Sequence, residues 1–283
     1  MKTVETIEQL RREIRAARSM GKTIGFVPTM GNLHEGHMSL VDQASEECDF
    51  VVTSIFVNPL QFNDQSDLGN YPRTLAADQE HLKDRDCDLL FFPNVDEMYP
   101  RGQDQQTTVH VPGVSQGLCG GSRPGHFDGV STVVSKLFNM VLPDAAFFGG
   151  KDYQQLAVIR KMVLDLDMPI KVVGVPTCRD TDGLAMSSRN GYLTPSERQQ
   201  AVHLSRVLTS MIQAIEQGER DYETLSSNAK ETLKAQGFEP DYVEVCHAQT
   251  LKPATEADKD IVVLGAAFLG KARLIDNMTL TLS

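Results

Sequence analysis

The chain has 283 residues, which is enough for one large domain or two ordinary ones. Hydrophobic residues make up 41% and charged residues 23%, as in an ordinary globular protein, and the net charge of −11 argues against a broad nucleic-acid or anionic-membrane surface. No apolar run approaches the roughly 20 residues that span a bilayer, and the N-terminus has no signal-peptide core. Together with five scattered cysteines and no Cys-x-x-Cys pair, this predicts a cytoplasmic protein with reduced thiols and neither a membrane nor a nucleic-acid partner.

Over the first 176 residues, amphipathic segments alternate with short apolar runs. Apolar side chains recur at helical spacing from Val4 to Ala17, so the chain is predicted to open with a helix. Four more helices are predicted at residues 36–48, 74–85, 130–138 and 156–163. Buried strands are predicted at residues 23–27, 50–57, 89–92, 145–148 and 171–175. The alternation predicts βαβ units in a Rossmann-like, doubly wound parallel sheet, in which ligands bind beyond the carboxyl ends of the strands.

The pattern changes near Pro176. A capping box from Thr194 to Glu197, with Pro195 at the first helical position, predicts a long helix that reaches Ile215. A second helix is predicted at residues 222–235 and three strands at 242–246, 261–268 and 273–282. We therefore predict a Rossmann-like domain over residues 1–176 and a smaller α+β lid domain over residues 177–283.

The turn at residues 28–37 carries the first group of chemically interesting side chains. His34 and His37 lie three positions apart at a helix start, so they share one face beside backbone N–H groups that lack helical partners. A helix N-terminus attracts phosphate, and imidazoles can hydrogen-bond phosphate oxygens. Half of a metal site and two plain surface histidines are the alternatives. The position at the carboxyl end of a predicted strand favours phosphate.

Two further loops offer groups that suit phosphate. Residues 186–190 combine two hydroxyls with Arg189, which can bind phosphate oxygens through two bonds. Residues 148–155 follow a predicted strand, where Gly149 and Gly150 allow close backbone approach and Lys151 can neutralise a phosphate. Neither a Walker loop nor a dinucleotide-binding Gly-x-Gly-x-x-Gly is present.

Three polar side chains on the same predicted edge suggest binding of an acid and a cation. The amides of Gln61 and Gln155 suit the hydroxyl and carboxylate oxygens of a hydroxy acid. Asp78 is a candidate ligand for a hard cation beside the phosphates, and a helix cap is the alternative. The segment 123–129 is either a basic substrate loop or a plain turn before a helix.

The order of these motifs resembles a known family. Residues 34–37 look like the HIGH motif of the nucleotidylyltransferase and class I synthetase superfamily, and residues 186–189 look like its KMSKS-type loop. Together the segments 28–37, 56–62, 71–74, 151–155 and 183–192 resemble the pantothenate synthetase family, and 273–277 continues the resemblance more thinly. It implies a Mg²⁺-dependent cytoplasmic enzyme, usually a homodimer. Such an enzyme condenses D-pantoate with β-alanine, using ATP and a pantoyl-adenylate, to give pantothenate, AMP and pyrophosphate for coenzyme A synthesis.

The resemblance also implies roles for individual residues. The implied catalytic residues are His34, His37, Lys151, Ser187, Ser188 and Arg189. The implied ATP-binding residues are Met30, Gly31, Asn32, Leu33, His34, Glu35, Gly36, His37, Gly149, Gly150, Lys151, Asp152, Cys178, Met186, Ser187, Ser188 and Arg189. Gln61 and Gln155 would bind pantoate, and Gln61 would also lie near the β-alanine.

One residue departs from the family pattern. The family is expected to have an acidic residue where this chain has Gly150. If that side chain only lines the pocket, its loss is tolerable; if it tunes Lys151 or the cation, affinity for Mg–ATP falls. The rival interpretations are a nucleotidylyltransferase acting on a phosphorylated substrate and a non-catalytic nucleotide sensor. A tRNA synthetase is disfavoured because the chain is short and acidic.

Overall fold

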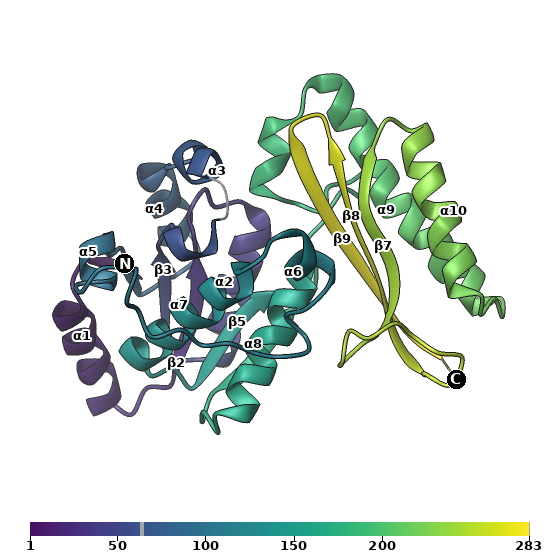
Figure 1. Ribbon diagram of the computed structural model, residues 1–283. Helices are drawn as coiled ribbons and strands as arrows, with labels where there is room; N and C mark the ends of the chain where they lie inside the picture. The colour runs from purple at the N-terminus through teal and green to yellow at the C-terminus, as the bar shows by residue number, and fades with distance from the viewer. Residues whose placement is uncertain (63–64, 283) are drawn as a thin grey trace. The chain divides into compact units, whose positions relative to one another are not determined.

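The computed structural model describes residues 1–62 and 65–282, which form two compact units (Figure 1). The first unit consists of Met1–Ser115, Arg123–Gly150 and Gln155–Pro176. The second consists of Gln116–Ser122, Lys151–Gln154 and Thr177–Ser283. The chain therefore crosses between the units more than once, and a lid role for residues 177–283 stays a prediction.

Within the described residues, the first unit has one six-stranded sheet in which all neighbouring strands are parallel. The strands are β1 (Lys2–Val4), β2 (Ile24–Thr29), β3 (Phe50–Ile55), β4 (Leu89–Phe91), β5 (Ala145–Gly149) and β6 (Lys171–Val175). Their order, β1-β4-β3-β2-β5-β6, confirms the predicted doubly wound sheet. The chain builds outward from β2 through β3 and β4 on one side, while β5 and β6 lie on the other. The order reverses between β2 and β5, which is where α/β sheets bind ligands.

Helices cover both faces of this sheet. In the first unit, the described helices of five or more residues are α1 (Ile7–Ser19), α2 (Glu35–Glu47), α3 (Gln65–Asn70), α4 (Leu75–Lys83), α7 (His126–Val141) and most of α8 (Tyr153–Asp165), and α5 (Val95–Met98) is shorter. Helix α6 (Leu118–Ser122) belongs to the second unit. Phe26 of β2 packs edge-on against Phe138 of α7, whereas Val27 joins a buried cluster with Met38 of α2. Successive strand side chains point to opposite faces, so α7 and α2 cover opposite sides of the sheet.

The structure differs from the sequence-based expectation at two helix starts. Val4 belongs to strand β1, where it pairs with Phe91 of β4, and does not open a helix. Helix α1 begins at Ile7 because Thr6 forms a capping box with Gln9. Helix α7 begins at His126, so the segment 123–129 includes a helix start in addition to a turn.

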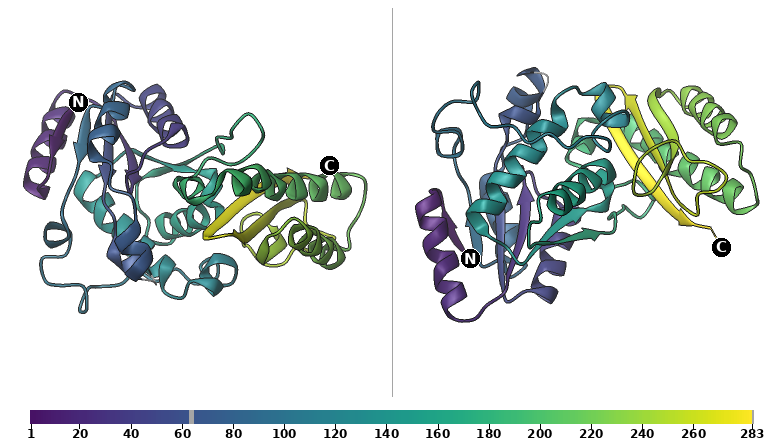
Figure 2. Two further views of the ribbon diagram at one scale, coloured as in Figure 1. Left: turned by 90° about the horizontal axis from the view of Figure 1, so that it is seen from above. Right: turned by 60° about the horizontal axis from the view of Figure 1, so that its bottom comes forward.

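The second unit contains an antiparallel sheet, ordered β7-β8-β9, among its described residues. Its strands are β7 (Glu239–His247), β8 (Asp260–Leu269) and β9 (Ala272–Thr281), and its two long helices are α9 (Pro195–Glu216) and α10 (Tyr222–Ala235). Figure 2 shows these helices along one face of the three strands, where they bury a shared apolar cluster. The predicted capping box at Thr194 and Glu197 is present. Among the described residues, no helix combines the length and hydrophobicity that a membrane crossing requires.

Candidate active site

Two of the predicted motifs lie at the reversal point of the sheet. Residues 30–34 connect β2 to α2, and Gly150 opens the 3-10 helix η2 (Gly150–Asp152) directly after β5. β2 and β5 are neighbours in the sheet, with Gly25 opposite Ala145. Because the two strands are parallel, the turn at 30–37 and the pair Gly149–Gly150 lie at the same edge.

The histidines cap helix α2 with their Nδ1 atoms. His34 is the N-cap residue and accepts a hydrogen bond from Gly36 N at 3.1 Å, while His37 Nδ1 accepts from His34 N at 3.3 Å. The ring centroids are 4.2 Å apart. A neutral imidazole that accepts at Nδ1 carries its proton on Nε2. Both rings are therefore hydrogen-bond donors at Nε2, at a helix N-terminus that also attracts anions.

The other residues of this turn offer a nucleotide mainly their backbone groups, because their side chains are buried or paired with other residues. Leu33 is buried in the cluster between the sheet and α2, so only its backbone can meet a nucleotide. Glu35 forms an ion pair with Arg85 at 2.7 Å. Gly31 has φ +83° and Asn32 has φ 52°, so two successive residues are left-handed. That residues 30–37 hold ATP stays a prediction, and within this turn the histidine rings and the backbone groups are the ones these contacts leave best placed for it.

Asp78, the predicted metal ligand, accepts hydrogen bonds from the histidine turn and from Thr74 in the structure. It is 2% exposed, and its carboxylate accepts hydrogen bonds from Asn32 N at 3.0 Å and from Leu33 N at 2.8 Å. Thr74 Oγ1 donates to it at 3.1 Å. Within the described residues, no group of three or more His, Cys, Asp or Glu residues could hold a metal ion. These contacts connect Asp78 to the histidine turn, and its role as a metal ligand beside the phosphates stays a prediction.

Gln61 lies in a buried network of amides. It is the last residue of the 3-10 helix η1 (Pro59–Gln61) and is 8% exposed. Its Nε2 donates to Met30 Sδ at 3.1 Å, and its Oε1 accepts from Asn58 Nδ2 at 3.1 Å. Asn58 Nδ2 also donates to Gly129 O at 3.1 Å. At Gly129 a Cβ atom would lie 2.8 Å from Gln61 N, so α7 can approach Gln61 this closely only with glycine.

Tyr99 and His126 support this network and were not predicted. Tyr99 is 3% exposed and donates from its hydroxyl to Asn58 Oδ1 at 2.7 Å, and burial raises its pKa. His126 Nδ1 donates to the backbone carbonyl of Gln61 at 2.8 Å. No local pattern marks Tyr99, whereas His126 lies in the segment 123–129 that the sequence left undecided. Gln155, the second predicted amide, lies half-buried near the start of α8.

In the second unit, the predicted loop is held by hydrogen bonds within its own backbone and by a helix cap. A β-bridge between Arg179 and Ala185 closes the loop, and Met186 N donates to Cys178 O at 3.0 Å. Ser187 caps the 3-10 helix η3 (Ser188–Tyr192) by accepting from Arg189 N. Cys178 therefore lies beside Met186, and the ATP contacts implied for both residues stay predictions.

The same unit holds Lys151 in place through its backbone and lines a small cavity with its side chain. Asn277 Nδ2 donates to Lys151 O at 2.8 Å, and Lys151 Nζ lies 3.7 Å from Asp152 Oδ2. Lys151 and Ser187 both line a cavity of 10 Å³, which is about the size of one water. The buried Asp276 accepts two hydrogen bonds from Arg179, at 2.7 and 2.8 Å, and thereby ties the loop to β9. The structure thus brings together Lys151 and Ser187, which the sequence separates by 36 positions.

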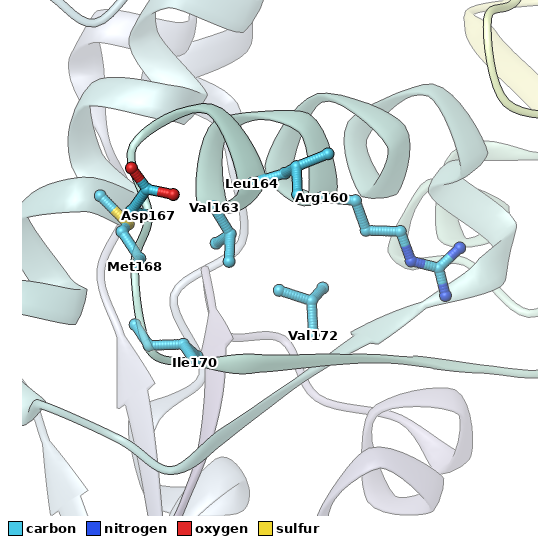
Figure 3. Close-up of a pocket in the computed structure, with 7 residues that line it drawn as sticks. All are labelled: Arg160, Val163, Leu164, Asp167, Met168, Ile170 and Val172. Carbon is cyan, nitrogen blue, oxygen red and sulfur yellow. The ribbon is translucent and has the colours of Figure 1, made fainter.

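Two larger cavities occur in the first unit. One of 250 Å³ lies at the carboxyl ends of β2, β3 and β4, and its walls include Met30, Gly31 and Asp78. The other, of 480 Å³, is an open groove between α8 and β6 with Arg160, Leu164 and neighbouring apolar side chains on its walls (Figure 3). None of the predicted site residues lines the groove, so it is not part of the candidate site.

Comparisons with known proteins agree with the motifs. A family model described as Pantoate-beta-alanine ligase matches residues 2–279. The chain is 60% identical over 282 residues to a pantothenate synthetase of Pseudomonas fluorescens (strain Pf0-1), covering 100% of this chain and 99% of the relative. A crystal structure of pantothenate synthetase from Thermus thermophilus superposes with a TM-score of 0.91 at 45% identity, over 98% of this chain and 99% of the other. A pantoate-beta-alanine ligase from Francisella tularensis, complexed with beta-gamma ATP and beta-alanine, gives a TM-score of 0.81 at 34% identity, over 98% and 97% of the two chains.

Proposed function

Since the chain belongs to the pantoate-beta-alanine ligase family and ligates pantoate to β-alanine to form pantothenate, we propose that it makes this bond through a pantoyl-adenylate. A carboxylate oxygen of pantoate bonds to the α-phosphorus of ATP as the bond from that phosphorus to pyrophosphate breaks. The amine nitrogen of β-alanine then bonds to the acyl carbon, the acyl–oxygen bond to AMP breaks, and the nitrogen loses a proton. Family membership sets aside the nucleotidylyltransferase and the nucleotide sensor.

The histidine turn carries this proposal. Negative charge develops on the phosphates as pyrophosphate leaves, so preorganised donors should supply most of the rate acceleration. His34 and His37 each carry a proton on Nε2, and α2 adds the positive end of its dipole. We assign the two histidines and the backbone of residues 30–36 to the triphosphate, with His37 as the proton donor to the phosphates.

The amide residues are assigned to the acid and the amine. Gln61 and Gln155 bind the hydroxyl and carboxylate of pantoate, and Gln61 also lies near β-alanine. Support comes from the network around Gln61, because Asn58 fixes which end of the amide carries its N–H groups. A buried amide with one allowed orientation can distinguish an acceptor from a donor on the substrate.

The second unit is assigned to the phosphates and the nucleoside. Lys151 and Arg189 neutralise the phosphates as pyrophosphate leaves, and the hydroxyls of Ser187 and Ser188 donate hydrogen bonds to them. Gly149 and Gly150, which belong to the first unit, let the nucleotide approach the backbone. The remaining assignments are Asp152 to the ribose and Cys178 and Met186 to the nucleotide through their main chain. The shared cavity of Lys151 and Ser187 supports grouping these residues.

Magnesium enters this scheme as part of the substrate Mg–ATP. Asp78 accepts three hydrogen bonds, and the described residues contain no metal-binding cluster. We therefore propose that phosphate oxygens and water hold most of the Mg²⁺ coordination shell, as is common for this ion. We further propose that the enzyme is a homodimer that works in the cytoplasm, where ATP is made and used.

Pyrophosphate release from Mg–ATP and D-pantoate, with and without β-alanine, tests the adenylate. We expect about one equivalent of pyrophosphate without β-alanine and continuous release, matched by pantothenate and AMP, with it. Release that depends strictly on β-alanine would contradict a separate adenylation step. Chelation of Mg²⁺ should stop both phases.

His34→Asn and His37→Asn test the histidine assignment. Asparagine keeps an acceptor for the capping N–H but lacks the Nε2 donor, so the helix cap is preserved while phosphate binding is lost. We expect pyrophosphate release to fall about 10²- to 10³-fold in each variant. His81→Ala, at an exposed histidine of α4, is the matched control. Turnover near that of the control would remove the histidines from the reaction.

A further inference from the structure

We propose that Asp78 is a positioning residue for the reaction, which holds the turn carrying His34 and His37 in its working conformation. This inference rests on the proposed function of that turn. Asp78 Oδ2 accepts from Asn32 N at 3.0 Å, and Asp78 Oδ1 accepts from Leu33 N at 2.8 Å. The carboxylate thus joins two successive backbone amides directly before the N-cap His34.

The conformation of the turn explains why such a partner is needed. Gly31 and Asn32 are both left-handed, with φ of +83° and 52°, and for Asn32 this region is less favourable than ordinary backbone angles. Two successive N–H groups that face the same way form a cradle for an anion. Here the anion is a side chain of the protein itself. A Cβ atom at Gly31 would lie 3.1 Å from Asp78 Oδ2, so the carboxylate also packs against the turn.

A cavity borders the turn on one side. The 250 Å³ cavity is lined by Met30 and Gly31 as well as by Asp78, and most of its other walls are apolar side chains such as Ile55 and Phe92. Apolar side chains cannot accept hydrogen bonds from the backbone N–H groups of Asn32 and Leu33, whereas the carboxylate of Asp78 does so.

Asp78 is itself well fixed by helix α4. It lies in the first turn of the helix, where a negative charge is favoured, and its backbone N donates to Thr74 O at 2.9 Å. Thr74 Oγ1 donates to Asp78 Oδ1 at 3.1 Å. The carboxylate therefore accepts from three donors, which an ionised carboxylate can do without presenting a donor of its own. An asparagine would turn an NH₂ group toward one of the backbone N–H groups.

Asp78→Asn is the decisive variant, and Glu80→Gln is its matched control. Glu80 is an exposed carboxylate of the same helix that is not placed at the turn. We expect Asp78→Asn to lower kcat for pantothenate formation about 10- to 100-fold, as for a small misplacement of catalytic groups. The KM for pantoate should stay within about twofold of the control, because Gln61 and Gln155 come from other elements. In NMR spectra, the amide protons of Asn32 and Leu33 should move upfield, since each loses a charged acceptor.

Magnesium dependence separates positioning from metal binding. The half-saturating Mg²⁺ concentration should be equal in Asp78→Asn and the control. Recovery of kcat at high Mg²⁺ would identify Asp78 as a metal ligand and overturn the inference. A kcat equal to that of the control would also overturn it.

Should Asp78→Asn fail to fold, Thr74→Val removes one of the three donors and should lower kcat about threefold with the same unchanged KM. If His34→Asn and His37→Asn lower kcat while Asp78→Asn does not, only the positioning role fails; if those histidine variants are fully active, the proposed function of the turn fails.

Discussion

Replacing Tyr99 by phenylalanine should weaken pantoate binding by removing one oxygen atom from the support of Gln61. The Tyr99 hydroxyl donates to Asn58 Oδ1 at 2.7 Å. The two amide hydrogens of Asn58 are used by Gln61 Oε1 and Gly129 O, both at 3.1 Å. These three bonds fix the orientation of Asn58 and, through it, that of the Gln61 amide.

The expected rise in the KM for pantoate follows from the hydrogen bonds that Asn58 Oδ1 keeps once the Tyr99 hydroxyl is removed. Without the hydroxyl, Asn58 Oδ1 keeps only a 3.4 Å contact from Leu60 N, which is near the limit for a hydrogen bond. A neutral hydrogen bond is worth about 0.5–1.5 kcal/mol, and about 1.4 kcal/mol corresponds to tenfold in an equilibrium constant. We therefore expect the KM for pantoate to rise about 2- to 10-fold, with a smaller change in kcat. The melting temperature should fall by a few degrees, on the order of 2–4 °C per kcal/mol.

The assay is the initial rate of pyrophosphate release as a function of pantoate concentration. Tyr222→Phe is the control, because the Tyr222 hydroxyl is buried in the second unit and has no hydrogen-bond partner in the described structure. Removing that hydroxyl should leave KM unchanged and should not lower the melting temperature. An unchanged KM for pantoate in Tyr99→Phe, alongside a raised KM in Gln61→Ala, would refute the link from Tyr99 to substrate binding.

Three further predictions concern charge and burial. Lys151→Ala should lower pyrophosphate release about 10²- to 10³-fold in the same assay, and near-normal adenylation would remove Lys151 from the phosphate-binding set. Arg198 donates hydrogen bonds that lower the pKa of Asp182 below its ordinary value of 3.8, so the stabilisation is present above that pH and is lost as the pH falls through the lowered pKa. Arg198→Gln should therefore lower the melting temperature at neutral pH and much less in strong acid, and an equal loss at every pH would contradict this. Burial raises the pKa of Cys246 to about 12, so iodoacetamide at neutral pH should leave this thiol unmodified in the folded protein, as mass spectrometry can check.

Most of the fold could be predicted because the apolar periodicity is strong where the core is built. Runs such as 50–57 and 145–148 are apolar at nearly every position, which is typical of parallel strands covered on both faces. The first strand could not be read this way. β1 has three residues, and Val4 fits a helical spacing with Ile7 as well as it fits a strand. Its pairing with β4, at Phe91, decides between the two and depends on a contact far along the chain.

The candidate site was predictable only where its chemistry is local in sequence. The spacing of His34 and His37, with the helix start beside them, is visible in ten residues. By contrast, the hydrogen bond between Tyr99 and Asn58 joins residues 41 positions apart in the sequence, and the one between Asn58 and Gly129 joins residues 71 positions apart. No local sequence motif therefore predicts the network around Gln61. The effect of Gly150, where the family pattern suggests an acidic residue, stays open in the same way because it depends on the bound Mg–ATP.

The case of Asp78 shows why a residue type at the right edge of a sheet does not define its role. A carboxylate beside a phosphate site can bind a cation or can accept backbone N–H groups, and its sequence position is the same in both cases. The backbone of residues 31–33 shows that Asp78 accepts two backbone N–H groups of a left-handed turn, a contact that the sequence position alone does not reveal, and the metal role stays a prediction. Asp78 and Asn58 are thus buried polar groups whose partners are the loops that carry the side chains proposed to bind substrate. Changes at these positions should reduce turnover or affinity by more than their effect on stability predicts, whereas truncation of a core residue such as Phe26 should act through stability alone.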